Sequence, residues 1–82
     1  MPKRKGPVQI RFELIEILRY SGKPMKKTHL WRMTSLSYDD FIKHIEFLKA
    51  KGLVSEVEEG YVLTKKGREV YDNLRNYILS LF

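Results

Sequence analysis

Lysine and arginine are the side chains of this sequence best placed to do chemistry, because they cluster near its N-terminus. Lys3-Arg4-Lys5 forms one cluster and Lys26-Lys27 another. Residues 1–33 hold nine Lys or Arg against two Glu, residues 34–60 hold three against six acids, and residues 61–82 hold four against two. The positive charge of the first third attracts polyanions such as nucleic acids, because lysines and arginines that neutralise phosphates release the counterions bound to them. The charge alone is equally consistent with a solvated surface that keeps a small protein soluble.

Catalytic and metal chemistry find little support in the sequence. His29 and His44 are the only histidines and there is no cysteine, so we expect no metal site and no other cofactor. The sequence contains no nucleophile–base pair and no glycine loop for phosphates, and 82 residues leave little room for a substrate cavity. An enzyme acting on a small molecule is therefore the least favoured class.

The first elements that would position the basic residues follow from hydrophobic periodicity. Apolar residues between Val8 and Tyr20 recur with a helical period, and Ser21-Gly22 ends this helix. Lys23-Pro24 forbids its continuation, and the segment allows a very short strand near Met25. A second, short helix is predicted over residues 27–33.

A third helix is predicted after a turn at Thr34-Ser35. Ser37 is its expected N-cap, and the two aspartates that follow favour the positive end of a helix. The helix should run to about Lys51, where Gly52 is a natural left-handed terminator. Its buried stripe is expected to comprise Phe41, Ile45 and Leu48.

Two β-prone runs and a final helix complete the chain. Residues 53–58 and 61–64 are separated by Glu59-Gly60, which predicts a hairpin, and Thr64 can cap a helix from about Lys65 to Leu81. This order predicts an α+β fold, a winged helix-turn-helix with three helices, a β-hairpin wing and a C-terminal dimerisation helix. The expected parts are a flexible basic tail (1–7), the winged helix-turn-helix domain (8–64) and the C-terminal helix (65–82).

Three motifs resemble an archaeal family. They are Lys27-Thr28-His29-Leu30, Leu36-Ser37-Tyr38 and Tyr61-x-Leu63-Thr64-x-Lys66-Gly67. They are similar to those of the ArnR-like winged helix-turn-helix proteins, which include the small Sulfolobus ten-kilodalton "a" type DNA-binding proteins and relatives in archaeal viruses and plasmids. The resemblance spans residue 8 to about residue 75, and it implies a DNA-binding homodimer joined through C-terminal helices.

The expected partner is double-stranded DNA, which a helix-turn-helix contacts with the N-terminal part of its second helix. Ser37 could cap that helix or donate to a phosphate, Tyr38 could contact a base or cover the core, and Lys43 could contact DNA or only pair with a neighbouring aspartate. The acidic wing tip, Glu58-Glu59-Gly60, is expected to avoid phosphates. The candidate DNA-binding residues are Lys3, Arg4, Lys5, Lys26, Lys27, Thr28, Arg32, Ser37, Tyr38 and Lys43.

The last helix carries more apolar residues than one short helix needs against so small a core. We expect a second subunit to bury part of this surface, although the helix could instead fold back on the first helix of its own chain. Trp31 is expected in the core or at a dimer surface. The candidate dimer residues are Val70, Leu74, Tyr77, Ile78 and Leu81.

Two further expectations concern location and function. The N-terminus lacks the apolar stretch of a signal peptide and no run is long enough to cross a bilayer, so a cytoplasmic protein without a membrane partner is expected. Transcriptional regulation or DNA organisation is the favoured function. The alternative is a winged helix that binds a protein, because Asp39, Asp40 and the wing tip are acidic.

Overall fold

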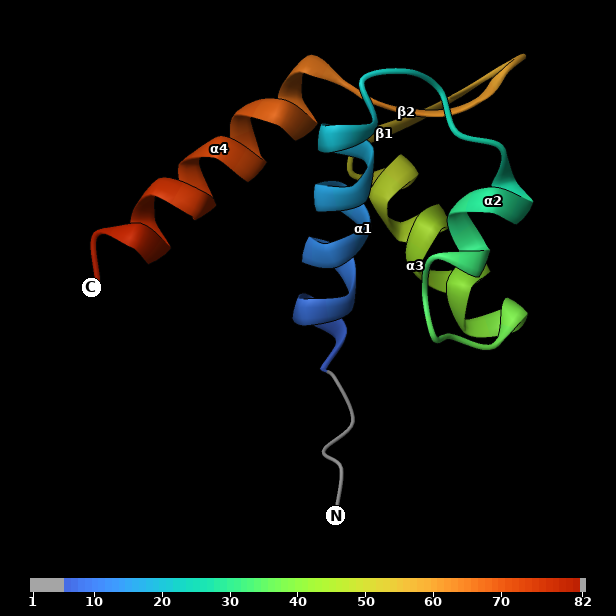
Figure 1. Cartoon of the computed structure of the whole chain (residues 1–82), viewed down its shortest axis with the longest axis horizontal. Helices are drawn as coiled ribbons and strands as arrows, with labels where there is room; N and C mark the ends of the chain where they lie inside the picture. Colours follow the sequence, from blue (N-terminus) through green and yellow to red (C-terminus); the bar gives the residue numbers. More distant parts are fainter. Residues whose placement is uncertain (1–5, 82) are drawn as a thin grey trace.

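The computed structural model describes residues 6–81, which form four helices and one two-stranded hairpin (Figure 1). The elements follow one another in the predicted order. They are α1 (Pro7–Ser21), α2 (Lys27–Arg32), α3 (Tyr38–Ala50), β1 (Val54–Val57), β2 (Gly60–Leu63) and α4 (Lys65–Leu79).

Helix α1 begins one residue earlier than predicted and ends at the predicted place. Gly6 is its N-cap and Pro7 its first residue, whereas the sequence predicts a start at Val8. Proline suits this position because its ring presets the helical φ and the missing N–H would have no partner in the first turn. At the other end Gly22 has φ 68°, the left-handed conformation that terminates a helix.

Helices α2 and α3 form a helix-turn-helix. The hydroxyl of Ser37 accepts a hydrogen bond from the backbone N–H of Asp40 at 3.2 Å, which confirms Ser37 as the N-cap of α3. Gly52 follows the helix with φ 75°, as predicted for a terminator. The predicted stripe is also confirmed, because all three of its residues are buried: Phe41, Ile45 and Leu48.

The antiparallel hairpin forms with Val54 opposite Leu63 and Val57 opposite Gly60. Its turn is therefore Glu58-Glu59, and the predicted turn at Glu59-Gly60 is wrong by one residue. Gly60 belongs to β2, where a Cβ would lie 2.2 Å from the carbonyl oxygen of Met25. The glycine is needed for this close approach of two backbones, and not for the turn.

Met25 forms the predicted short strand. Its N–H donates to the carbonyl of Tyr61 at 3.0 Å, and the N–H of Tyr61 donates back at 2.8 Å. The segment before α2 is thus fixed to the hairpin, so the wing and the helix-turn-helix form one unit.

Helix α4 starts as predicted and ends sooner. The hydroxyl of Thr64 accepts from the N–H of Gly67 at 3.0 Å and so caps the helix. The helix ends at Leu79 and not at Leu81, because the hydroxyl of Ser80 bonds the carbonyl of Tyr77 at 2.7 Å and the last turn tightens. Leu81 therefore follows the helix.

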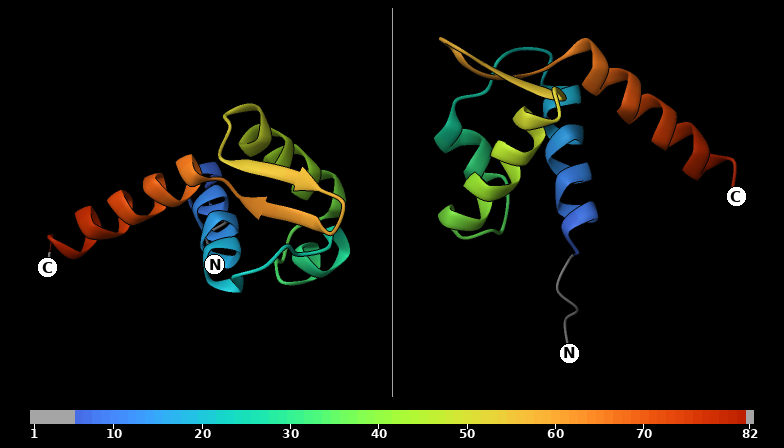
Figure 2. Two further views of the ribbon diagram at one scale, coloured as in Figure 1. Left: turned by 90° about the horizontal axis from the view of Figure 1, so that it is seen from above. Right: turned by 180° about the vertical axis from the view of Figure 1, so that it is seen from behind.

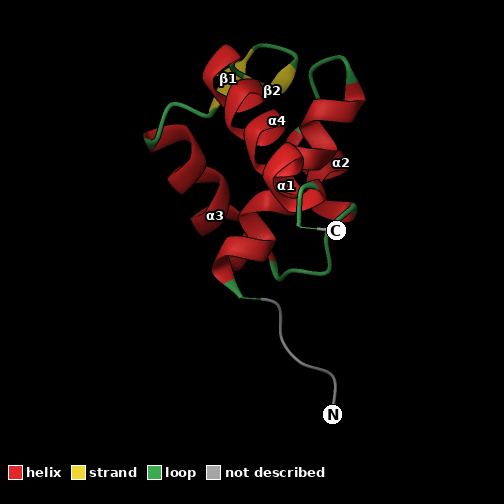
Figure 3. Cartoon of the chain, turned by 90° about the vertical axis from the view of Figure 1, so that its left-hand side faces the viewer, coloured by secondary structure: helices red, strands yellow, loops and turns green. Residues whose placement is uncertain are grey.

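A single hydrophobic core lies where α1, α2, α3 and the hairpin meet, and it confirms the α+β winged helix-turn-helix fold. The hairpin covers one end of the helices (Figure 2), most of the chain is helical (Figure 3), and α4 leads away from the other elements. Within residues 6–81, no helix is long and apolar enough to cross a membrane. The core residues are Leu14, Ile15, Leu18, Met25, Leu30, Phe41, Ile45, Leu48, Val54, Tyr61, Leu63 and Tyr71.

Candidate nucleic-acid interface

The beginning of α2 places several of the candidate residues near one another. Lys26 is the N-cap of α2 and is exposed, as are Thr28 and, at the last residue of the helix, Arg32. Lys27 is half-buried, with its ammonium 6.0 Å from the centre of the Tyr61 ring. Tyr61 raises the pKa of Lys27, so this side chain remains a cation at neutral pH.

The first turn of α3 meets the end of α2 through aromatic rings. Tyr38 lies edge-to-face against Trp31, with ring centres 5.4 Å apart, and tilted against Phe41 at 6.4 Å. The indole N–H of Trp31 donates to the carbonyl of Leu36 at 3.0 Å, so Trp31 fixes the turn between the two helices. Tyr38 therefore covers the edge of the core, while 44% of it stays exposed.

Lys43 is exposed on α3, one turn after Asp39. No ion pair joins it to Asp39 or Asp40 within the described part of the chain. Its ammonium is thus available to a partner outside the protein. Three further candidates, Lys3, Arg4 and Lys5, lie outside the described residues. The two acids at the turn of the hairpin, Glu58 and Glu59, are exposed.

Arg11 is a basic residue of α1 that lies against α3, and the sequence did not single it out. The carbon of its guanidinium lies 3.6 Å from the centre of the Phe47 ring, and its Nε donates to His44 Nδ1 at 3.3 Å. On the same ring, the ammonium of Lys51 lies 5.5 Å from the centre. The contact joins α1 to α3 over 33 positions of sequence, which no local pattern reveals.

Arg11 also affects the protonation of His44. Burial lowers the pKa of His44 most, and the positive charges of Arg11 and Lys43 lower it further, against the opposing effect of Asp40. Since Nδ1 accepts a hydrogen bond, the neutral ring carries its proton on Nε2.

The end of α3 is fixed to the wing by charged side chains. Lys49 Nζ lies 2.9 Å from an oxygen of Glu56 on β1 and 3.4 Å from an oxygen of Glu46 on its own helix. These contacts raise the pKa of Lys49, and Lys49 lowers that of Glu56. Two of the six acids between residues 34 and 60 are thereby paired.

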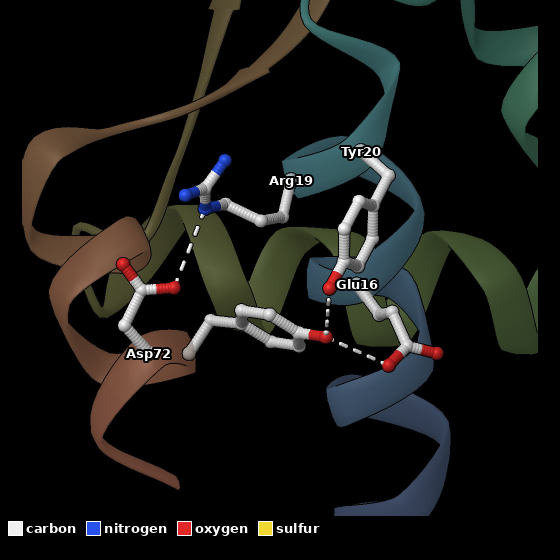
Figure 4. Close-up of polar contacts among 5 residues, drawn as sticks. Glu16, Arg19, Tyr20 and Asp72 are labelled. Atoms are coloured by element: carbon white, nitrogen blue, oxygen red, sulfur yellow. Dashed lines mark hydrogen bonds and ion pairs between the residues drawn. The ribbon is translucent and has the colours of Figure 1, made fainter. Parts of the chain in front are cut away.

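The first half of α4 packs against α1 through Tyr71. Its ring stacks on that of Phe12, with the ring centres 5.2 Å apart. Its hydroxyl donates to Glu16 at 2.8 Å and lies 3.5 Å from the hydroxyl of Tyr20 (Figure 4). Burial is the main cause that raises the pKa of Tyr71. Beside this cluster Arg19 bonds Asp72 at 3.4 Å. The second half of α4 points away from α1 (Figure 1).

The candidate dimer residues lie mostly on this second half. Val70 is half-buried, whereas the other four are exposed. Exposed fractions are 42% for Leu74, 65% for Tyr77, 41% for Ile78 and 67% for Leu81. Helix α4 thus folds back on α1 through its first half and leaves an apolar surface exposed on its second half. Burial of that surface by a second subunit stays a prediction.

Comparison with known proteins agrees with this architecture. Residues 4–81 match the Winged helix-turn-helix family over nearly the whole chain. The chain belongs to this family. An uncharacterized protein of Methanocaldococcus jannaschii is 27% identical over 71 residues, which cover 87% of this chain and 71% of that protein.

As a winged helix-turn-helix, the chain has α3 as its recognition helix and β1–β2 as its wing. Domains of this family are typically DNA-binding and not enzymatic. Among the described residues, no group of three or more His, Asp or Glu is arranged to hold a metal ion.

Proposed function

We propose that this winged helix-turn-helix protein binds double-stranded DNA and acts as a transcriptional regulator or an architectural DNA-binding protein. The observation that carries the proposal is that the first residues of α3, Tyr38 to Asp40, and Lys43 one turn later are exposed beside the unpaired cations of the helix-turn-helix. Lys26 and Lys43 are exposed, and no carboxylate pairs with either among residues 6–81. The finer assignment to ArnR-like proteins rests on the three sequence motifs, and the archaeal relative is consistent with it.

Fluorescence anisotropy with a labelled duplex at increasing salt tests this proposal. Each phosphate contact should contribute a slope of about −0.9 to the plot of log affinity against log salt. A chain that fails to bind any duplex at low salt, or binds with no salt dependence, would contradict the function. Comparing the affinity for a specific duplex with the affinity for random duplexes would distinguish a regulator from an architectural protein.

We further propose that two chains pair through the second half of α4. Five apolar side chains exposed by 41–67% on one short segment are more than a monomer of this size normally leaves in water: Leu74, Tyr77, Ile78, Leu79 and Leu81. Light scattering should give the mass of a dimer, and Leu74→Glu or Ile78→Lys should give that of a monomer. A wild-type monomer at micromolar concentration would overturn the pairing.

A protein-binding winged helix is the second candidate, because the wing tip and the first turn of α3 are acidic. It predicts feeble DNA affinity and a protein partner. The triple change of Lys26, Lys27 and Lys43 to alanine distinguishes the two. If duplex binding is abolished while circular dichroism shows an intact fold, the protein-binding alternative loses its support.

A further inference from the structure

Beyond the predicted contacts, one side of α3 and its C-cap carries two lysines that form no ion pair among the described residues, unlike Lys49 on the same helix. Lys43, Phe47 and Lys51 follow one another at intervals of four residues, so they lie along one side of the helix. Arg11 of α1 lies beside this stripe with its guanidinium on the Phe47 ring. We name these four residues the α1–α3 basic seam. It contains three cations and an aromatic ring.

The position of Arg11 is determined by two contacts, and neither is an ion pair. Its guanidinium carbon lies over the Phe47 ring, 3.6 Å from the ring centre, and its Nε–H donates to His44 Nδ1. Within residues 6–81 no carboxylate forms an ion pair with it. The two terminal nitrogens of Arg11 carry four N–H groups, which remain free to donate to a ligand. The side chain that carries them is half-exposed and is held in one orientation by Phe47 and His44.

A guanidinium in this state suits a phosphate. Its two terminal nitrogens match two phosphate oxygens, and the stacked ring removes part of the rotamer entropy that binding would otherwise cost. The neighbouring acid is Asp40, whose charge reaches His44, but Arg11 and Lys43 both act on the same imidazole with the opposite sign. At this imidazole, two cations therefore oppose one anion.

We infer that Arg11 is a phosphate clamp, and that the α1–α3 basic seam contacts the DNA backbone alongside the recognition helix. This inference rests on the proposed DNA binding and identifies its surface. It supplies the positive charge that the acidic first turn of α3 lacks. Phe47 acts as a positioning residue, because it orients Arg11 and need not touch the nucleic acid itself.

Arg11→Gln tests the clamp, with Arg19→Gln as its matched control. Both changes remove one positive charge from α1, but Arg19 pairs with Asp72 and lies away from the seam. We expect Arg11→Gln to weaken duplex binding about tenfold and to reduce the salt slope by about 1, and Arg19→Gln to change affinity less than about twofold. Arg11→Lys should keep the slope but recover only part of the affinity, because it lacks the planar fork.

An NMR titration of His44 in the free protein gives an independent control. The pKa of His44 should rise in Arg11→Gln and stay unchanged in Arg19→Gln. This result would show that Arg11 contacts His44, independently of any DNA binding. Circular dichroism on each variant excludes loss of fold. Phe47→Leu, which leaves the charge intact, should weaken binding several-fold.

Three results would overturn the clamp. The first is equal affinity of Arg11→Gln and Arg19→Gln for the duplex, and the second is no effect of Phe47→Leu. The third concerns an oligoglutamate peptide. If this peptide binds the wild type as tightly as a duplex of equal charge, and binds Arg11→Gln more weakly, the seam is assigned to an acidic protein partner. If the wild type binds no duplex while the pKa of His44 still depends on Arg11, the proposed DNA binding is wrong, but the contact between Arg11 and His44 is confirmed.

Discussion

The hydroxyl oxygen of Tyr61 is buried and has no partner at hydrogen-bond geometry among the described residues, although the nearby ammonium of Lys27 acts on it and lowers its pKa. The side chain is 1% exposed, and burial raises the pKa of its phenol. An unpaired buried hydroxyl costs free energy, so Tyr61→Phe should leave the free energy of unfolding unchanged or raise it by about 1 kcal/mol. Urea denaturation measures this. A loss of more than about 1 kcal/mol would indicate that the hydroxyl has a stabilising partner.

Gly60 is the second residue whose role the tertiary structure decides. Its φ of 137° and the carbonyl of Met25, 2.2 Å from where a Cβ would lie, both exclude a side chain. Gly60→Ala should lower the free energy of unfolding by about 2 kcal/mol or more. Thermal unfolding checks this, with Gly6→Ala as control because nothing lies within 4 Å of that position. Equal unfolding temperatures for the two variants would contradict the close approach.

Among the elements, α3 and the wing are joined by Lys49 and Glu56, and this contact predicts a dependence on pH. The folded protein holds the pKa of Glu56 below its ordinary 4.5. The contact therefore stabilises the fold at neutral pH, and this contribution is lost as the pH falls through the lowered pKa. The free energy of unfolding of the wild type should exceed that of Glu56→Gln at pH 7, and the difference should vanish once the pH falls below the lowered pKa of Glu56. A difference that persists in acid would contradict the pairing.

Helices α1 and α4 are joined by the hydroxyl of Tyr71 and the carboxylate of Glu16, 2.8 Å apart. Tyr71→Phe keeps the stack on Phe12 and removes this bond, and it should cost about 1 kcal/mol of unfolding free energy. If α4 pairs two chains, the same change should also weaken the dimer, because a loosened α4 presents its apolar surface less firmly. Light scattering over a dilution series measures this, and Glu69→Gln on the exposed side of α4 is the control.

At the scale of the whole molecule, its charges are distributed over separate surfaces. The exposed acids of the wing tip lie at the end of the hairpin, whereas Arg11, Lys43 and Lys51 gather at α1 and α3. Reversing the charge of the wing tip, through Glu58→Lys and Glu59→Lys together, should raise duplex affinity if the wing lies near phosphates. We expect little change, because the sequence predicts a wing that avoids them. Anisotropy at low salt, where charge effects are largest, decides between these outcomes.

Much of the fold could be predicted from local sequence. The N-caps Ser37 and Thr64, the terminators Gly22 and Gly52, and the stripe of α3 are all confirmed, because each depends on neighbours within one or two helical turns. The errors fall at ends of elements. Pro7, the turn at Glu58-Glu59 and the end of α4 differ by one or two residues, since frayed ends and hairpin register depend on contacts from outside the element.

The sequence by itself determined the order of elements and the basic character of the N-terminal third, because periodicity, caps and charge are properties of short segments. Only the tertiary structure decided which cations can act. It placed Lys27 against Tyr61, paired Lys49 with Glu56, and set Arg11 on Phe47 without a carboxylate partner. These contacts join residues far apart in the chain, and they arise from the packing of helices on a shared core. No spacing in the sequence encodes them.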